Sequence, residues 1–250
     1  MLPYRKFPEK TILNRIEIIN GVLSTRTGKT TYLEIGVEKG HCFLSVKADR
    51  RVAVDPKFKI PVKRRLLASL KDKFNGKESH YFEQTSDDFF AQNAAILEGG
   101  IDAAFVDGLH TYQQSYQDVK NCLKHLKPGG AIMMHDCSPP NRAAAFAADS
   151  IERARDLQGE GWKRDWCGDV WKMIVHLRST EPDLRVMVFD CDFGVGVVTR
   201  GKPEKILDYK PEEIAGLSYD LIEKDRVGLL NLKPPSYMPE FLNHLRSEKA

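Results

Sequence analysis

Residues 105–137 read FVDGLHTYQQSYQDVKNCLKHLKPGGAIMMHDC, and this stretch decides the fold. One apolar run, at 101–107, ends in Asp-Gly-x-His, and a second, at 131–136, ends in His-Asp. Apolar and aromatic side chains at helical spacing lie between them and predict a helix that stops at Lys-Pro-Gly-Gly. A helical crossover of this kind joins neighbouring parallel strands, so the two ends should lie side by side. Burying acidic and imidazole groups there costs free energy unless they have a binding partner or a role in chemistry.

The rest of the chain continues the alternation of strand and helix. Further strands are predicted at 31–36, 51–55, 80–84, 184–190 and 195–200, and the last two are close enough to form a hairpin. Helices are predicted at 9–24, 38–46, 62–73, 86–99, 142–157, 169–179 and 211–225. This order predicts an α/β fold, with a doubly wound, mostly parallel sheet, helices on both faces and a C-terminal antiparallel hairpin. We expect one domain over 1–250, with a helical segment at 1–29, a core at 30–200 and an extension at 201–250.

The composition indicates a globular protein without a polyanionic partner. The chain has 250 residues, of which 42% are hydrophobic and 29% charged, and a net charge of +3. The basic stretch 57–67 alternates with apolar residues like a solvated helix face, so we expect no nucleic-acid partner. No apolar run reaches the ~20 residues that span a bilayer, and the N-terminus lacks the core of a signal peptide. Five cysteines without a CxxC pair indicate reduced thiols, so we expect a cytoplasmic protein.

Polar residues recur at the carboxyl ends of five consecutive predicted strands. In open parallel sheets, ligands bind outside these ends, near the point where the strand order reverses. Scattered surface charges would not be expected to select the same end of five strands. The residues concerned are Glu34 with Gly36, Asp55, Ser86, Asp107 and Asp136.

The ends of the first strands are predicted to bind a nucleoside. Gly36 allows a sharp turn and the close approach of a ligand, and Gly40 allows the next helix to start close to the sheet. Asp55 ends the following strand, where its carboxylate, paired with Glu34, can accept hydrogen bonds from both hydroxyls of a ribose. Ser86 either contacts the adenine or serves only as a helix N-cap.

The same stretch argues against a dinucleotide. The fingerprint G-x-G-x-x-G would need glycine at two further positions, which are Glu38 and His41. Glu38 also places negative charge near a predicted helix N-terminus, where phosphates normally sit. A cationic, phosphate-free nucleoside suits this acidic edge better, and S-adenosylmethionine (SAM) has these properties.

The next two strand ends are predicted to carry the chemistry. Two neighbouring carboxylates, Asp107 and Asp136, need a cation or proton between them, and carboxylate oxygens favour hard cations such as Mg²⁺. His135 is either a third metal ligand or, if strand alternation turns it away, a buried, hydrogen-bonded histidine. His110 could remove a hydroxyl proton at neutral pH, with Asp107 beside it, or could simply begin the helix.

Four motifs together resemble the class I SAM-dependent methyltransferases. They look most like the small-molecule O-methyltransferases that are grouped with the sugar methyltransferases of macrolide and aminocoumarin pathways. The motifs are LEIGVEKG (33–40), VAVDP (52–56), FVDGLHTYQQSYQDV (105–119) and LKPGGAIMMHDC (126–137). GDVWK (168–172) and RVGLLNLKP (226–234) also look familiar from this group.

This resemblance covers about 30–200 and implies a Rossmann-like sheet of seven strands with SAM over Gly36 and Gly40 and its ribose on Asp55. It also implies a divalent metal and a catalytic base. In the sugar methyltransferases the acids that match Asp107 and Asp136 hold the metal, and the histidine that matches His110 is the proposed base. Metal-dependent members often carry an acid before the second aspartate, where this chain has His135, so metal dependence stays open.

The expected function is methyl transfer from SAM to a hydroxyl oxygen of a small acceptor, such as a sugar. One alternative is an NAD-dependent oxidoreductase on a similar sheet, which Glu38 disfavours. Another is a non-catalytic SAM-fold binding module, against which the set of Asp107, His110 and Asp136 argues. The sequence is also compatible with a homo-oligomer, in which 211–245 would pack against a second subunit.

Overall fold

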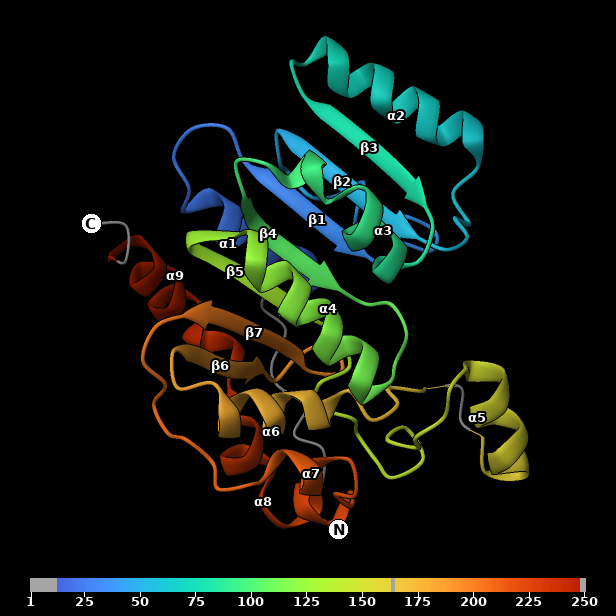
Figure 1. Cartoon of the computed structure of the whole chain (residues 1–250), viewed down its shortest axis with the longest axis vertical. Coiled ribbons are helices and arrows are strands. Elements are labelled where there is room, and N and C mark those ends of the chain that lie inside the picture. The colour runs from blue at the N-terminus through green and yellow to red at the C-terminus, as the bar shows by residue number, and fades with distance from the viewer. Residues whose placement is uncertain (1–12, 163–164, 248–250) are drawn as a thin grey trace.

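The computed structural model describes residues 13–162 and 165–247, and its centre is one mixed β-sheet (Figure 1). The strands are β1 (Thr31–Ile35), β2 (Arg50–Asp55), β3 (Glu78–Glu83), β4 (Ile101–Val106), β5 (Leu126–Met134), β6 (Leu184–Phe189), β7 (Val195–Arg200) and β8 (Leu232–Lys233). Within the described residues these eight strands lie in the order β3-β2-β1-β4-β5-β7-β6-β8. Only β7 runs antiparallel to its neighbours, so the predicted α/β fold and its terminal hairpin are confirmed.

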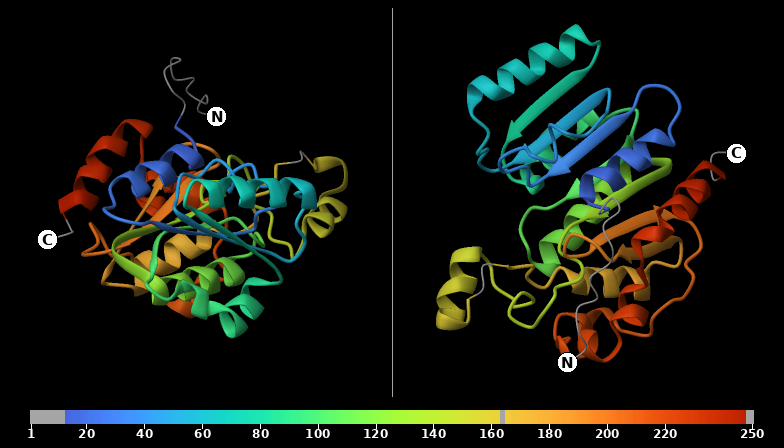
Figure 2. Two further views of the ribbon diagram at one scale, coloured as in Figure 1. Left: turned by 90° about the horizontal axis from the view of Figure 1, so that it is seen from above. Right: turned by 180° about the vertical axis from the view of Figure 1, so that it is seen from behind.

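Helices cover both faces of this sheet. They are α1 (Arg15–Ser24), α2 (Val62–Phe74), α3 (Ser86–Gln92), α4 (Tyr112–His125), α5 (Ile151–Gln158), α6 (Trp171–Thr180), α7 (Pro211–Ile214), α8 (Asp220–Leu230) and α9 (Met238–Ser247). Buried side chains of α3, α4, α6, α7 and α8 form one core with one face of the sheet. Those of α1 and α9 form the second core on the other face, as the view from behind shows (Figure 2).

The first helix begins later than the sequence pattern predicts. The side chain of Asn14 accepts hydrogen bonds from the backbone N–H groups of Ile16 (2.9 Å) and Glu17 (3.1 Å). The Glu17 carboxylate in turn accepts one from the backbone N–H of Asn14 (3.2 Å). This capping box fixes the start of α1. The first part of the predicted helix, 9–12, lies outside the described residues.

The helix predicted at 38–46 is wrong. This segment forms consecutive turns, with only isolated helical hydrogen bonds such as that from Leu44 N to Gly40 O (3.1 Å). The φ angles of Gly36, Glu38 and Gly40 are 81°, 47° and 71°. Because a right-handed helix needs negative φ at every residue, these three positions break it. Gly40 therefore serves a turn that packs on Ile60 and does not start a helix.

Three smaller differences concern element boundaries, and two short elements were not predicted at all. The helix predicted at 86–99 is shorter and is followed by a 3₁₀ turn, Ala94–Leu97. The helix predicted at 142–157 is confirmed only from Ile151, and the one predicted at 211–225 divides into α7 and α8. The helix α9 and the two-residue strand β8 were not predicted. Because β8 pairs with β6, the sheet gains a strand beyond the seven implied by the family resemblance.

All five cysteines lie in the described part of the chain and are free thiols. Within residues 13–162 and 165–247, no helix combines the length and the apolar character needed to cross a membrane.

Candidate active site

The acidic residues that follow β4 and β5 meet at one edge of the sheet. The two strands are parallel neighbours, and Val106 lies opposite Met134 at their carboxyl ends. The backbone N–H of Asp107 donates to Ile35 O (2.8 Å), and that of His135 donates to Val106 O (3.1 Å). These bonds continue the sheet by one residue and hold both strand ends rigidly, so the predicted juxtaposition of the two aspartates is real.

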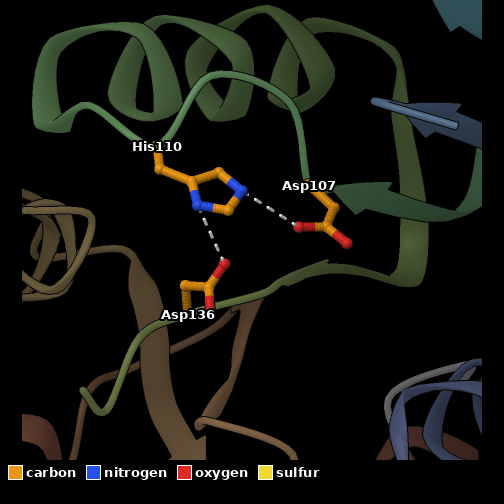
Figure 3. Close-up of side chains that lie close together, drawn as sticks. All are labelled: Asp107, His110 and Asp136. Carbon is orange, nitrogen blue, oxygen red and sulfur yellow. Dashed lines mark ion pairs between the residues drawn. The ribbon is translucent and has the colours of Figure 1, made fainter. Parts of the chain in front are cut away.

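An imidazole lies between the two carboxylates (Figure 3). His110 Nε2 lies 3.6 Å from Asp107 Oδ1, and His110 Nδ1 lies 3.3 Å from Asp136 Oδ2. His110 stands on the loop between β4 and α4, which turns back over the end of β5 (Figure 3). The sequence therefore identified three residues that the fold brings together.

The segment 166–169 fixes the orientation of the His110 ring. Trp166 stacks on it, with ring centroids 5.2 Å apart, and the Trp166 carbonyl lies 2.9 Å from His110 Nδ1. Gly168 has a φ of 61°, and a Cβ atom there would lie 1.8 Å from the His110 carbonyl oxygen. Asp169 Oδ1 accepts a hydrogen bond from the Tyr112 N–H (2.7 Å) at the start of α4. The GDVWK motif thus has a structural role: it holds the loop that carries His110.

His135 also faces the site, which strand alternation did not predict. Its Nδ1 lies 3.0 Å from Asp136 Oδ2 and 3.4 Å from Asp107 Oδ1. Asp136 has a φ of 62°, so the regular alternation of side chains ends at this residue. The side chains of His135 and Asp136 therefore lie on the same side. His135 is buried, as one of the two sequence interpretations expected, and it contacts both carboxylates.

Two residues of the site were missed. Arg15, the first residue of α1, donates to Asp107 Oδ2 (2.8 Å) and to both carboxylate oxygens of Asp192 (2.7 and 3.0 Å). Asp192 lies in the turn between β6 and β7, and its Oδ1 is 3.5 Å from His135 Nε2. Topology offered a signal for Asp192, because the turn after a parallel strand lies at the carboxyl edge of the sheet. No local signal marked Arg15.

Charge pairing, which outweighs burial, sets the ionisation of this cluster. Burial alone would raise the pKa of Asp107, but the cations of His135 and His110 hold that pKa well below its usual range. Burial would lower the pKa of His110, yet Asp107 and Asp136 raise it to about 8. The pKa of His135 is likewise raised well above its usual value. The imidazoles therefore carry protons at neutral pH, and they balance the carboxylates together with Arg15.

The strand ends predicted to bind a nucleoside lie beside this cluster. A Cβ atom at Gly36 would lie 2.0 Å from the Asp107 carbonyl oxygen, so glycine is required where the turn after β1 passes the end of β4. Asp55 Oδ2 accepts the backbone N–H groups of Val37 and Glu38 (2.8 Å each), and Oδ1 accepts that of Lys57 (2.7 Å). Asp55 therefore shapes the turn. Each carboxylate oxygen has two lone pairs, so a ribose hydroxyl can still bind to Oδ1.

The other predicted cofactor residues face inward. Glu34 is buried and accepts a hydrogen bond from the hydroxyl of Tyr32, with Cys42 nearby. Burial raises the pKa of Glu34 to about 8. Ser86 faces α4, where its hydroxyl accepts a hydrogen bond from Gln114 Nε2 (3.2 Å). The N-cap of α3 is Thr85, so the alternative role of Ser86 as N-cap is wrong.

The donor set fits a divalent cation. Single ligand atoms of Asp107, His110 and Asp136 lie within 4.8 Å of one another. Two carboxylates and an imidazole suit a hard or borderline cation that keeps several waters. In the present arrangement Arg15 and His135 neutralise the same carboxylates.

The comparison with protein families agrees with this geometry. Residues 33–137 match the model of a methyltransferase domain. The matched stretch runs from β1 to the residue after Asp136 and includes the turn at Gly36, the carboxylate of Asp55 and the whole set around His110. Together with the fold, this match confirms the resemblance to the class I methyltransferases that the motifs predicted. None of the curated proteins matches the sequence.

Solved structures with a similar fold differ widely in sequence. Cofactor-bound Rv0187 from MTB has 12% identity and a TM-score of 0.49, over 78% of this chain and 84% of that one. The O-methyltransferase TomG from Streptomyces achromogenes, involved in tomaymycin synthesis and solved with SAM, has 13% identity and a TM-score of 0.47, over 74% and 78%. The O-methyltransferase from Bacillus cereus, solved with SAH, has 15% identity and a TM-score of 0.44, over 76% and 82%.

Proposed function

We propose that this protein transfers the methyl group of SAM to a hydroxyl oxygen of a small acceptor, with a sugar as the first candidate. The observation that carries the proposal is the imidazole of His110, held between two carboxylates at the carboxyl ends of β4 and β5. This cluster lies inside the stretch that matches a methyltransferase domain. It stands next to the turn at Gly36, where such sheets bind their ligands.

In the proposed mechanism, the neutral form of His110 takes the proton of the acceptor hydroxyl at Nε2, so methyl transfer should become faster as the pH rises through the His110 pKa of about 8. The Trp166 carbonyl accepts a hydrogen bond from Nδ1–H, which leaves Nε2 as the basic nitrogen of the neutral ring. Asp107 and Asp136 stabilise the imidazolium that forms, because both lie within 3.6 Å of the ring nitrogens. Bound SAM supplies an electrophilic methyl group on a positively charged sulfur. The protein would position the acceptor oxygen in line with the bond between methyl carbon and sulfur, which breaks as the oxygen–methyl bond forms and so releases S-adenosylhomocysteine.

The cofactor proposal assigns SAM to the edge formed by Gly36, Gly40 and Asp55, with Glu34 below it and Ser86 on the adenine side. The free carboxylate lone pair of Asp55 supports a ribose contact. We also propose Mg²⁺ at Asp107 and Asp136, with His135 beside them. A divalent cation there would polarise a bound hydroxyl and lower its pKa.

Two general assignments complete the proposal. The five free thiols support a reducing, cytoplasmic compartment. The small net charge supports a small-molecule acceptor over a nucleic acid.

The test is methyl transfer from methyl-labelled SAM to a panel of hydroxyl acceptors, comprising sugars, phenols and a lipid-linked glycan, alongside the amine counterparts of the sugars and phenols. We expect labelled product from one hydroxyl class, with loss of that product in His110→Gln. SAM binding without transfer to any hydroxyl would favour the non-catalytic binding module, and transfer to an amine would overturn the proposed acceptor class.

A further inference from the structure

Helix α2 packs against the sheet with its polar side inward. Asp72 is buried and pairs with Arg51 of β2, and it accepts a hydrogen bond from the Ser79 hydroxyl of β3 (2.5 Å). Arg65 also turns inward, where its guanidinium lies 4.9 Å from the centroid of the Phe58 ring. Ordinary surface helices bury an apolar stripe and expose the polar face. The packing of α2 is the reverse.

The apolar side chains of α2 consequently point outward. Val62, Leu66, Leu70 and Phe74 recur at every fourth position and form one row, with Leu67 beside it. All five are more than half exposed, and Phe74 is 89% exposed. Five of the eleven large exposed apolar side chains in the described chain belong to this one helix. A contiguous row of this kind is typical of an interaction surface.

Cations accompany this apolar row. Lys63, Arg64, Lys71 and Lys73 are exposed on the outward part of α2, and the one acid of the helix is the buried Asp72. An exposed helix face that combines large apolar side chains with Lys and Arg, and lacks acids, suits the interface of an anionic lipid bilayer. We propose that α2 binds peripherally to an anionic membrane surface, with Leu66, Leu70 and Phe74 inserted between the headgroups.

The position of α2 permits this contact. It lies beside β3, the edge strand of the sheet, at the end of the molecule opposite β6 and β8, and the other helices lie away from its outward side (Figure 1). The view from behind shows α2 similarly free (Figure 2). A flat bilayer can therefore reach the whole length of the helix.

Two other occupants fit less well. A second copy of the chain would place two identical cationic faces together without an acid on either, which costs repulsion at the centre of the interface. A nucleic acid would be attracted by the cations but would leave five large apolar side chains without a partner, because phosphate contacts need no such row.

The test is co-sedimentation of the full-length protein with vesicles made of phosphatidylserine and phosphatidylcholine in equal parts, and with vesicles of phosphatidylcholine alone. We expect binding to the mixed vesicles that weakens as salt increases. Combining Leu66→Ser, Leu70→Ser and Phe74→Ser should reduce this binding at least tenfold, about the loss expected for one buried large apolar side chain. Combining Lys63→Gln, Lys71→Gln and Lys73→Gln should reduce it about a hundredfold.

A matched control removes exposed apolar side chains elsewhere. Combining Ile206→Ser and Val227→Ser should leave vesicle binding unchanged, since both residues are comparably exposed but lie outside α2. Circular dichroism of every variant checks that the fold is retained.

Three results would overturn the proposal. The first is equal binding to both kinds of vesicle, or to neither. The second is a wild-type dimer in sedimentation velocity that becomes monomeric in the apolar triple variant, which would assign the face to a second copy. The third is capture of an RNA or DNA duplex that survives the apolar substitutions, which would assign it to nucleic acid.

Discussion

His110 is held at both nitrogens, which is unusual for a histidine that only begins a helix. Its Nδ1 faces the Trp166 carbonyl and Asp136, and its Nε2 faces Asp107. Two carboxylates around one imidazole also raise its pKa to about 8, which suits a group that must hold and release a proton near neutral pH.

Replacing this imidazole should therefore abolish most of the methyl transfer. We expect His110→Gln to lower the rate on the true acceptor by about 10²–10⁴-fold, the usual contribution of a general base, with SAM affinity unchanged. His125→Gln, at the far end of α4, is the matched control and should retain wild-type turnover. A near-normal rate in His110→Gln would remove the residue from the mechanism.

Glu34 makes a separate prediction about pH and stability. Burial raises its pKa from the usual 4.5 to about 8, so between these pH values the folded protein binds a proton that the unfolded chain releases. As the pH rises through this window, the free energy of unfolding should accordingly fall by up to about 1.4 kcal/mol per pH unit. Urea titrations across the window should show a flatter profile for Glu34→Gln, and an identical slope in both proteins would show that Glu34 is ionised in the fold.

The sequence located part of the site at this scale. The sequence pattern identified Asp107 and Asp136 because they end predicted strands, and His110 because it precedes a predicted helix. The sequence pattern missed that His135 and Asp136 face the same side, because this depends on the left-handed backbone of Asp136, which no periodicity reveals. Arg15 was missed because its contact with Asp107 joins residues 92 positions apart.

At the scale of elements, the segment from Trp166 into α6 acts as a support for the loop that carries His110. Gly168 touches the backbone of His110, and Asp169 accepts the N–H of Tyr112. Lys172 holds Asp169 in place through an ion pair of 3.2 Å and also donates to the Ala215 carbonyl (2.7 Å). The support is thereby tied to the C-terminal extension.

A side chain at Gly168 should disturb this support. Gly168→Ala must displace the His110 carbonyl and also strain a positive φ, so we expect a loss of about 2 kcal/mol or more in the free energy of unfolding, with a clear loss of activity. Gly76→Ala is the matched control, because its φ of 69° is also positive but no atom lies within 4 Å of the added Cβ. That variant should lose about 1 kcal/mol and keep its activity. Equal losses in both would mean that only backbone strain matters.

Element types were predictable from periodicity, and their exceptions have physical causes. The segment 38–46 was predicted as a helix, but the turn that leads into it passes the end of β4 at Gly36, and the backbone N–H of Glu38, whose φ is positive, donates to the Asp55 carboxylate. Helix α2 was correctly placed by its pattern, but the pattern could not tell which side faces the sheet. The buried partner of Asp72 is Arg51, which lies on β2 directly before the apolar residues 52–54.

At the scale of the whole molecule, the extension after residue 200 is packed into the same sheet. Strand β8 pairs with β6, and Phe241 and Leu245 of α9 are buried against α1 and the sheet. Arg226 donates to the Ser138 hydroxyl (2.7 Å), which lies just after Asp136. These contacts support the proposal of a single domain over the chain. They also give the motif at 226–234 a structural role, because it supplies the edge strand β8 and Arg226, which binds Ser138.

The most direct test of the account is isothermal titration of the purified protein with SAM, before and after chelation and with Mg²⁺ restored. We expect micromolar SAM binding in every case, with Mg²⁺ raising the affinity through Asp107 and Asp136. An SAM affinity that is the same with and without Mg²⁺ would indicate that His110 acts without a metal. No SAM binding under any condition would contradict the central claim, because the fold would then carry a different ligand at the edge formed by Gly36 and Asp55.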